Sequence, residues 1–287
     1  MEISDLIVFK AVVEQGGITR AAKTLHRVPS NVTARIQKLE QELETTLFVR
    51  DKNRLRISPA GETLLDYAQK ILTLTQQAID QLHPSTPTGQ LKIGSMEATA
   101  ANRLAGPLAQ FHAQHPEVQL ELQTNPSGTL IDQVVTGELD LAFVADPIKD
   151  PRLNLTRAYN ETLILISHHQ HPLIKTINDL APHPTVLGFS NRCAYRTRLT
   201  QWLSMGSVTA NVVEISSYHS LLACVAAGMG VGIIPESLLK DYPFQQRLKT
   251  HRLPTKIKRS TTYMVWRKDS VKVSMTTFAE LIRNEPG

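Results

Sequence analysis

The chain has 287 residues, 41% of them hydrophobic and 20% charged, which suits a folded protein of roughly two domains at about 150 residues each. Two cysteines without a CxxC pair argue against a disulfide-built secreted domain, and no apolar run approaches the roughly 18 residues that span a bilayer. The net charge is +5, and the stretch from Arg20 to Arg56 holds nine Lys/Arg against four Asp/Glu, which suggests an acidic partner.

The N-terminal stretch is predicted to be helical. Glu2 and Asp5 precede a short amphipathic segment, so we expect no signal peptide and a soluble cytosolic protein. The apolar residues of this first helix, which ends at Gly16–Gly17, are Leu6, Phe9, Val12 and Val13. Thr19 is placed to cap a short second helix over RAAKTL. A basic third helix over PSNVTARIQKLE completes a helix-turn-helix pattern.

The third helix has one apolar face and one donor-rich face. We expect its apolar residues, Val28, Val32, Ile36 and Leu39, to pack on the first two helices. The opposite face can reach base edges and phosphates in a major groove. The following LFVRDKNRLRIS predicts a β-hairpin wing whose arginines and Lys52 hold phosphates or enter a minor groove. The residues expected to bind DNA are Arg20, Arg27, Pro29, Ser30, Asn31, Thr33, Arg35, Lys38, Arg50, Arg54 and Arg56. The alternative is an ordinary small helical domain with solvated charges.

A long helix is predicted from Pro59, with Ser58 as its N-cap. Its apolar residues follow a heptad stripe, and we expect them to pair with the same helix of a second subunit. The predicted dimerisation residues are Leu64, Leu65, Ala68, Ile71, Leu72, Ala78, Ile79 and Leu82. The alternative is that the stripe packs onto its own domain. HPSTPTG, residues 83–89, then breaks the helix.

From Gln90 onward the pattern alternates between strands and helices, which predicts an α/β domain with mostly parallel sheets. The predicted strands are QLKIGSM, VQLELQT, LDLAFVAD, ETLILIS, TVLGFS, VVEIS and VGIIPE. Ligands of such sheets bind at the carboxyl ends of the strands. Polar groups followed by helix starts lie at three of these ends: 95–97, 125–129 and 190–193. Helix N-termini with hydroxyl side chains suit an anionic or strongly polar ligand.

The charge of that ligand is left open by the sequence. Glu97 precedes a helix, which favours its ionised form, and with Asp146 it could pair with an amine. Arg192 and Arg196 argue for a carboxylate, and an amino acid would satisfy both signs. The alternative is that Glu97 and Arg196 are an ordinary helix-start carboxylate and an exposed helix residue.

Other chemistries have weaker signals. Cys193 beside Arg192 would favour a thiolate and permits a redox-sensing alternative, whereas Cys224 within LLACVAAG fits a buried core position. HHQH at 168–171 lacks carboxylate or thiol partners, so we expect no metal and no cofactor. No nucleophile elbow, P-loop or dinucleotide fingerprint indicates an enzyme, although a solute-binding protein or enzyme with an added DNA-binding domain is a further alternative. The acid-free stretch 247–259, with six basic residues, is interpreted as the solvated face of a hairpin.

The ordered motifs resemble the LysR-type transcriptional regulators over essentially the whole chain. They are AAKTLHRVPSNVTARIQKLEQEL, LFVR, ISPAG, HPL at 171–173 and VAAGMGVGIIPE. The resemblance implies a winged helix-turn-helix (1–59), a linker and dimerisation helix (60–83) that pairs antiparallel with a second copy, a hinge (84–89) and an effector domain (90–287). The two lobes of that domain, like periplasmic type 2 binding proteins, would comprise about 90–160 with 266–287 and about 161–265.

The resemblance also implies a function and partners. A homodimer or homotetramer would bind promoter DNA and contact RNA polymerase, and a small effector between the lobes would change how the DNA is bent. It places the following residues around the cleft, to which the strand-end pattern adds Asp146: Ser95, Met96, Glu97, Thr99, Ser127, Thr129, Ser190, Arg192, Cys193, Tyr195, Arg196 and Tyr218.

The chain departs from the family pattern in three places, which makes the operator sequence unpredictable. Gly17 stands for the usual serine, Pro29–Ser30 for the usual glutamine and proline, and Glu44 for the glycine that normally ends the third helix. HRVPSNVT, GSMEATAA, FSNRCAYR and SYHSLLACVAAG are similar to one branch of the family, the regulators of putrescine utilisation.

Overall fold

The computed structural model describes residues 1–51, 54–82, 87–145, 150–206, 208–240 and 242–284, without the side chains of residues 50, 51, 54, 76, 77, 80–82 and 284. The chain forms two compact units, residues 1–84 and residues 85–287, each described here by itself. Among the described residues, no helix has the length and apolar character needed to cross a membrane.

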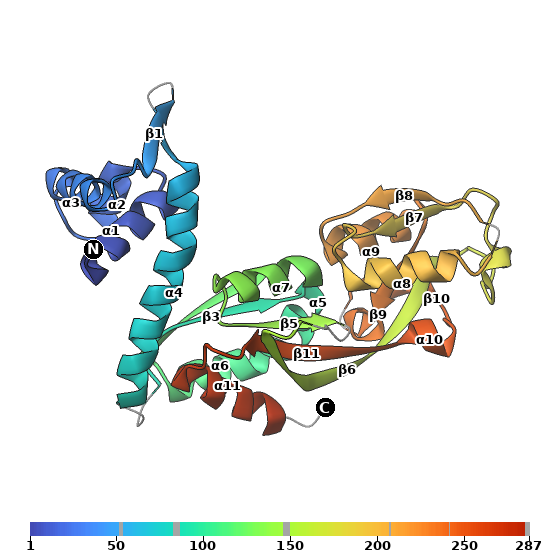
Figure 1. Ribbon diagram of the computed structural model, residues 1–287. Helices are drawn as coiled ribbons and strands as arrows, with labels where there is room; N and C mark the ends of the chain where they lie inside the picture. Colours follow the sequence, from blue (N-terminus) through green and yellow to red (C-terminus); the bar gives the residue numbers. More distant parts are fainter. Residues whose placement is uncertain (52–53, 83–86, 146–149, 207, 241, 285–287) are drawn as a thin grey trace. The chain divides into compact units, whose positions relative to one another are not determined.

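The first unit is a winged helix-turn-helix followed by a long helix (Figure 1). Its elements are α1 (Ile3–Glu14), α2 (Ile18–Thr24), α3 (Pro29–Glu42), β1 (Phe48–Asp51), β2 (Arg54–Ile57) and α4 (Pro59–Leu82). Strands β1 and β2 pair antiparallel and form the predicted wing. Phe9, Ala21, Val32 and Leu39 are fully buried between the three helices, so the predicted order of elements is confirmed.

Two details of the predicted helices are wrong. Thr19 does not cap α2, because the chain turns at Gly16, which is left-handed at φ 64°, and the helix starts at Ile18, two residues earlier than predicted, with Gly17 as its N-cap. Val28 does not pack on the first helices: its side chain is 63% exposed. It is the N-cap residue of α3 with an extended backbone, so it lies off the apolar stripe that Val32 and Ile36 continue.

Glu44, which stands where the family usually has glycine, ends helix α3. Thr45 N–H donates to the Glu40 carbonyl and Glu44 N–H to the Gln41 carbonyl, the hydrogen bonds of a Schellman motif. Such a motif needs a left-handed residue, and Glu44 adopts φ 49°. A side chain in this region costs about 1–2 kcal/mol that glycine does not incur, so the α3 end carries backbone strain.

Replacing Glu44 with glycine should therefore raise the free energy of unfolding of residues 1–84 by about 0.5–1 kcal/mol, since glycine's extra freedom in the unfolded chain offsets part of the gain. Urea denaturation followed by far-UV circular dichroism measures this change. Glu44→Ala is the matched control, because it removes the carboxylate but keeps the Cβ. Equal stabilisation by both substitutions would show that charge, not backbone strain, is the cause.

Helix α4 starts as predicted and packs partly onto its own unit. Ser58 Oγ accepts from Gly61 N–H at 3.0 Å, which makes Ser58 the N-cap. Ala68 is fully buried, and four other predicted dimerisation residues are half-buried against the same core. They are Leu64, Leu65, Ile71 and Leu72. The own-domain alternative therefore holds for the first half of the helix, whereas Ala78 and Ile79 are exposed, as are Tyr67 and Leu74. The Leu82 side chain lies outside the described residues.

The second unit is an α/β domain built around a mixed sheet. Its strands are β3 (Gly89–Ser95), β4 (Val118–Thr124), β5 (Leu141–Ala145), β6 (Leu153–His168), β7 (Thr185–Gly188), β8 (Asn211–Glu214), β9 (Val231–Pro235), β10 (Leu248–His251) and β11 (Arg259–Arg267). Its α-helices are α5 (Glu97–Thr99), α6 (Ala105–Gln114), α7 (Ser127–Thr136), α8 (Ala194–Leu203), α9 (Tyr218–Ala226), α10 (Thr255–Lys258) and α11 (Val273–Asn284). A π-helical turn, Ala100–Leu104, joins α5 to α6.

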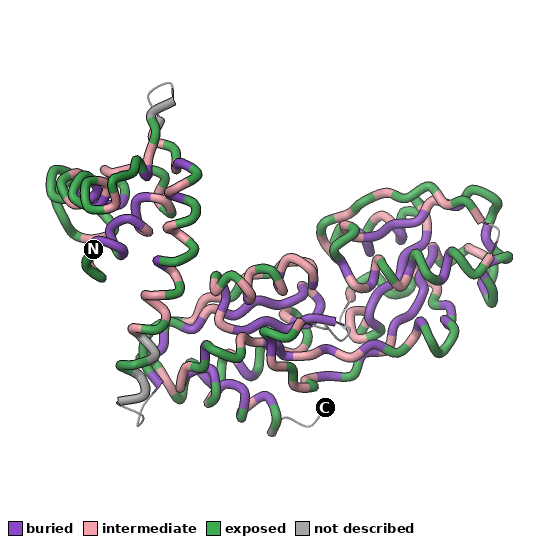
Figure 2. The backbone as a smooth tube through the Cα atoms, viewed as in Figure 1, coloured by how far each residue is buried: buried purple, intermediate pink, exposed green. Residues whose placement is uncertain are grey.

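The strand order β4-β3-β5-β11-β6-β9-β7-β8 divides this unit into two lobes. Strands β3, β4 and β5 are parallel in one lobe, and β7, β8 and β9 are parallel in the other. The long strand β6 joins them, since its first half pairs with β11 and its second half with β9 and β10. Figure 2 shows buried residues along the central strands of both lobes.

The sequence prediction missed several elements of this unit. Strand β6 begins at Leu153, before the predicted ETLILIS, and β11 and α11 were not anticipated. The acid-free stretch 247–259 is not a hairpin: β10 pairs with β6, and α10 follows it. Strand β11 pairs with β5 from Thr262, so it joins the first lobe four residues before the predicted boundary at 266.

Candidate functional sites: the α3 surface and a cavity between the lobes

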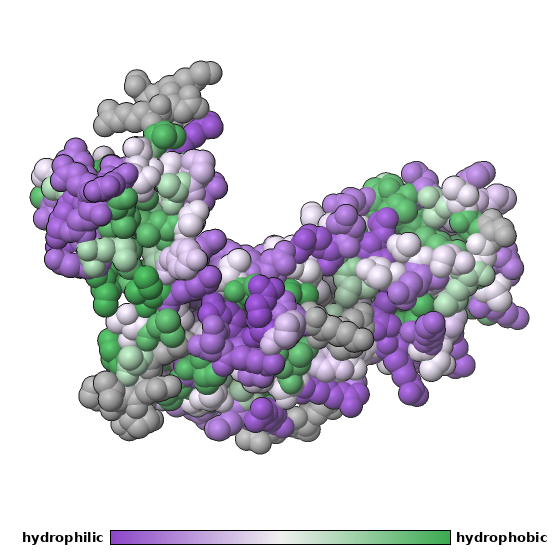
Figure 3. Space-filling model, viewed as in Figure 1, coloured by the Kyte–Doolittle hydropathy of each residue, from purple (hydrophilic) through white to green (hydrophobic). Residues whose placement is uncertain are grey.

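The start of α3 presents an exposed polar surface. The exposed residues here are Arg27, Pro29, Ser30 and Asn31. Arg20 on α2 is also exposed, and its Nη2 donates a hydrogen bond of 2.8 Å to the Gly16 carbonyl. Thr33 is half-buried and its hydroxyl donates to the Pro29 carbonyl. Figure 3 shows hydrophilic side chains gathered over α3. Such a helix end offers hydroxyl, amide and guanidinium groups to an approaching duplex.

Arg35, which was predicted to bind DNA, forms an ion pair within the fold. Its Nη1 lies 2.7 Å from Asp5 Oδ1 and 2.7 Å from Ser4 Oγ, both at the start of α1. The Asp5 side chain has no solvent exposure, so Arg35 supplies the counter-charge of a buried carboxylate and ties α3 to α1. Lys38 is exposed but pairs with Glu2 at 3.2 Å, and this pairing raises the pKa of Lys38 and lowers that of Glu2.

The wing carries the remaining basic residues of this unit. Val49 pairs with Arg56 and Phe48 with Ile57 in the β1–β2 ladder, and the Arg56 side chain is exposed. The side chains of Arg50 and Arg54 lie outside the described residues, as does Lys52, so their predicted contacts with DNA stay predictions.

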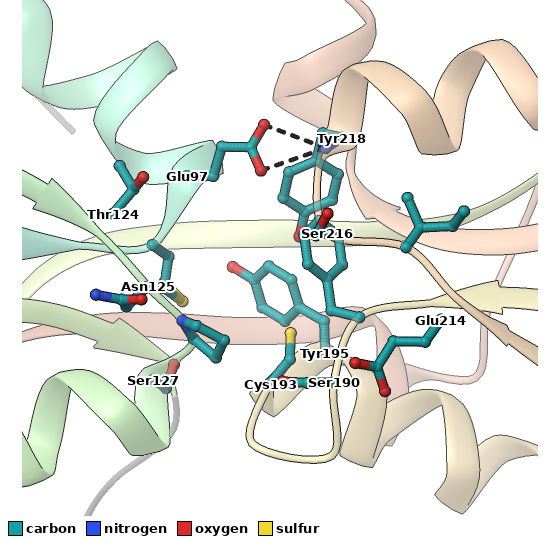
Figure 4. A pocket seen from close by; sticks show the side chains of 14 residues that line it. Glu97, Thr124, Asn125, Ser127, Ser190, Cys193, Tyr195, Glu214, Ser216 and Tyr218 are labelled. Carbon is teal, nitrogen blue, oxygen red and sulfur yellow. Dashed lines mark hydrogen bonds between the residues drawn. The ribbon is translucent and has the colours of Figure 1, made fainter. Parts of the chain in front are cut away.

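A cavity of about 250 Å³ lies between the two lobes of the second unit (Figure 4). Its lining residues follow the carboxyl ends of β3 and β4 in one lobe and of β7 and β8 in the other. They are Met96, Glu97, Thr124, Asn125, Pro126, Ser127, Phe189, Ser190, Cys193, Tyr195, Glu214, Ile215, Ser216 and Tyr218. The ends of parallel strands thus converge on one hollow, as expected for this class of sheet.

Only part of the predicted effector set lines this cavity. The predicted residues that do so are Met96, Glu97, Ser127, Ser190, Cys193, Tyr195 and Tyr218. Ser95 and Thr99 are buried in the fold beside it, and Asp146 lies outside the described residues. Glu214 and Phe189 were missed, although each lies at the end of a predicted strand. The strand-end rule would have found them had it been applied to residues 189 and 214–216.

Glu97 connects the two lobes. Its carboxylate accepts the Tyr218 N–H at 3.1 and 3.3 Å, at the first turn of α9 in the other lobe (Figure 4). The expectation that its helix start would favour the ionised form is wrong in sign: burial raises the pKa of Glu97, and the Tyr218 N–H and His219 offset this only in part. The Tyr218 N–H and the charge of His219 thus compensate only part of the cost of burying this carboxylate.

Arg192 also bridges the lobes, but outside the cavity. Its Nη2 donates to the Gly128 carbonyl and pairs with Asp132, and its Nε donates to Thr129 Oγ1 at 3.2 Å. Gly128 N–H returns a hydrogen bond of 3.1 Å to the Arg192 carbonyl, and a Cβ at Gly128 would lie 3.3 Å from the Arg192 side chain. Neither Arg192 nor Arg196 lines the cavity, so the prediction that they bind a ligand carboxylate there is not supported.

The cysteines differ from their predicted environments. Cys193 is buried at the start of α8, and burial raises its pKa, which contradicts the expected thiolate. Cys224 is only half-buried, and it packs against the hydrophobic core. Among the described residues, no group of three or more His, Cys, Asp or Glu side chains could hold a metal ion.

Comparison with protein families covers nearly the whole chain. Residues 3–62 match the bacterial regulatory helix-turn-helix proteins of the lysR family, and residues 84–286 match the LysR substrate binding domain. The chain is 37% identical to the uncharacterized HTH-type transcriptional regulator YusT of Bacillus subtilis, over 98% of this chain and 95% of the relative. It is 34% identical to the HTH-type transcriptional regulator GltR of the same species, over 94% and 92%.

Solved structures show the same fold. Full-length OxyR from Pseudomonas aeruginosa superposes with a TM-score of 0.79 at 22% identity, covering 99% of this chain and 95% of that one. CbnR complexed with its target DNA gives 0.68 at 21% identity, covering 99% of both chains. The helix-turn-helix, the two-lobed domain and the sequence relatives agree, and the chain belongs to the LysR family of transcriptional regulators.

Proposed function

We propose that this regulator responds to a small amine cation bound in the cavity between the lobes. The carrying observation is the charge of the lining. Glu97 and Glu214 line the cavity, and no Lys, Arg or His is among its described lining residues. An ammonium group in the cavity would add to Glu97 the counter-charge that His219 supplies only in part.

The remaining lining suits such a cation. The Phe189 and Tyr218 rings lie 4.5 Å apart, and Tyr195 faces the same hollow (Figure 4). Aromatic faces attract ammonium groups once these are desolvated. The hydroxyls of Ser190 and Ser216 add hydrogen-bond partners for a second polar group, so a diamine and an amino acid are both candidates.

A narrower assignment concerns the kind of amine. The resemblance to regulators of putrescine utilisation agrees with a diamine, but the relatives named above do not carry that assignment in their names. We further propose that the protein acts in the cytoplasm as a homo-oligomer, through the exposed second half of α4, and that it contacts RNA polymerase at its promoter.

DNA recognition is assigned to the exposed start of α3 and to the wing. Ser30 and Asn31 project from the first turn of α3, and their hydroxyl and amide groups match donor and acceptor patterns on base edges. Arg20, Arg27 and Arg56 would then hold phosphates on either side.

The test measures binding to the DNA upstream of the protein's own gene, with and without putrescine, longer amines, amino acids, dicarboxylates and aromatic acids. We expect an amine to change the affinity for DNA and to raise the melting temperature. At a hundred times its dissociation constant, the amine should add about 2.7 kcal/mol to the free energy of unfolding. Glu97→Gln should weaken amine binding roughly tenfold or more while leaving unliganded DNA binding intact.

Glu117→Gln is the matched control, since Glu117 is exposed and does not line the cavity. A response to carboxylates alone, or an amine response that survives in Glu97→Gln, would contradict the proposal. A sequence-specific regulator should lose affinity for its own upstream DNA as the salt concentration rises, and should bind random DNA only weakly. A protein that binds DNA only through its positive charge should bind both DNAs alike.

A further inference from the structure

A second hollow, of about 620 Å³, lies on the lobe formed by β7–β10 and shares no residue with the effector cavity. Its floor is apolar and includes Leu163 and Ile164 of β6 and Leu253 after β10. We call it the basic hollow, because Lys175, Arg252 and Lys258 line it. Most of its lining comes from residues 250–258, within the acid-free stretch 247–259, and from residues 173–175. Neither segment belongs to the DNA-binding surface or to the effector cavity.

The three cations of the basic hollow are unpaired within the part of the chain that the structure describes. None of their side chains forms a hydrogen bond or an ion pair there; the Lys175 and Arg252 side chains are exposed, and that of Lys258 is half-buried. Glu236 is the one carboxylate among the described lining residues. Asp179, which does not line the hollow, interacts electrostatically with Lys175. The three cations still outnumber these two carboxylates, so the hollow has a surplus of positive charge that attracts anions.

The backbone segments that carry these cations are each held in place. Ile174, next to Lys175, donates its N–H to His251 Nδ1 at 3.0 Å. Arg252 follows directly on β10, which is paired along β6. Lys258 ends α10, whose Lys256 and Ile257 carbonyls accept from Arg198 Nη1 at 3.3 Å. Cations on fixed segments around one hollow lose less entropy on binding than cations on mobile loops.

We propose that the basic hollow binds a small polyanion, either a phosphate ester or a di- or tricarboxylate. Arg252 provides a guanidinium fork for two anionic oxygens, and the two ammonium groups provide point charges beside it. A site of this size, with an apolar floor and a few convergent polar groups, fits a metabolite rather than a single ion.

The test titrates the full chain with pyrophosphate and with citrate by calorimetry at constant ionic strength. The double variant Arg252→Gln/Lys258→Gln should bind at least roughly tenfold more weakly than the wild type. The double variant Arg157→Gln/Lys268→Gln removes the same charge from exposed positions away from the hollow and should bind like the wild type. Binding of pyrophosphate alone would identify a phosphate ligand, and of citrate alone a carboxylate.

An equal loss of anion affinity in both double variants would overturn the proposal. The absence of binding by either anion would also overturn it, even if an acidic peptide binds instead. Melting curves of all variants check that they are folded. The basic hollow is independent of the amine site: its anion affinity should persist in Glu97→Gln, so failure of one proposal leaves the other standing.

Discussion

Replacing Arg35 with alanine should lower the free energy of unfolding of residues 1–84 by about 3 kcal/mol. Breaking a buried ion pair from one side costs about 3–5 kcal/mol, because the remaining charge stays buried without a partner. Here the remaining charge is Asp5, whose side chain has no exposure, while Arg35 is partly exposed and Lys38 lies 4.0 Å from the same carboxylate. These two facts place the cost at the lower end of the range.

The measurement is denaturation followed by far-UV circular dichroism, because residues 1–84 are mostly helical. Both tryptophans, Trp202 and Trp266, lie in the second unit, so their fluorescence should show no change and serves as an internal control. Lys38→Ala removes an exposed partner of Glu2 and should cost much less stability than Arg35→Ala, because water screens the exposed pair. Asp5→Asn in the Arg35→Ala background should recover part of the loss, since it removes the buried charge.

The same variant decides between two roles of Arg35. If Arg35 read a base, Arg35→Ala would keep the stability of the wild type and lose affinity for specific DNA only. If it holds α3 against α1, specific and random DNA binding should both fall as the helix-turn-helix loosens. Retained stability with selective loss of specific binding would contradict the structural role.

The sequence predicted the helix-turn-helix well because its signals are local. Apolar spacing, Gly16 and Pro29 each act within a few residues of where they stand in the chain. The Arg35–Asp5 pair joins residues 30 positions apart, and nothing local marks Arg35 as different from the exposed arginines. The sequence therefore assigns this basic residue to DNA, and only the structure shows that it also has a partner within the fold.

The effector domain shows the same division. Strand ends in parallel sheets meet at one edge, so the cavity could be located from the sequence. The sign of the cavity's charge could not be predicted, because Arg192 pairs with Asp132, a partner 60 residues earlier in the chain, and does not line the cavity. Strand β11 was missed because RSTTYMVWR follows a run of basic residues and neither alternates cleanly nor forms an apolar block. Its pairing with both β5 and β6 determines its place.

Acidification from pH 6.5 to pH 4 should remove up to about 3 kcal/mol of the stability of residues 85–287 through His251 alone. Burial, with His171 and Lys249 as smaller contributions, lowers the pKa of His251 from 6.5 to about 4. The ring is enclosed: Nδ1 accepts the Ile174 N–H at 3.0 Å, and Nε2 lies 2.8 Å from Ser167 Oγ. The Nδ1 acceptor needs a neutral ring, with its proton on Nε2.

The sign follows from where each state takes up this proton. The unfolded chain protonates His251 below pH 6.5, while the folded chain resists protonation until about pH 4, so falling pH favours unfolding across that interval. Above pH 6.5 both states are neutral and the histidine contributes no pH dependence. The difference between a pKa of 6.5 in the unfolded chain and about 4 in the folded chain corresponds to roughly 3 kcal/mol.

Tryptophan fluorescence during urea unfolding at pH 7, 6, 5 and 4 measures the effect. His251→Asn places an amide oxygen where Nδ1 accepts from Ile174, so this variant should be less stable than the wild type at pH 7 but lose less stability on acidification. His112→Gln, a change at an exposed histidine of α6, should keep the wild-type slope. Parallel pH profiles for all three proteins would mean that carboxylates elsewhere in the domain, and not His251, set its acid sensitivity.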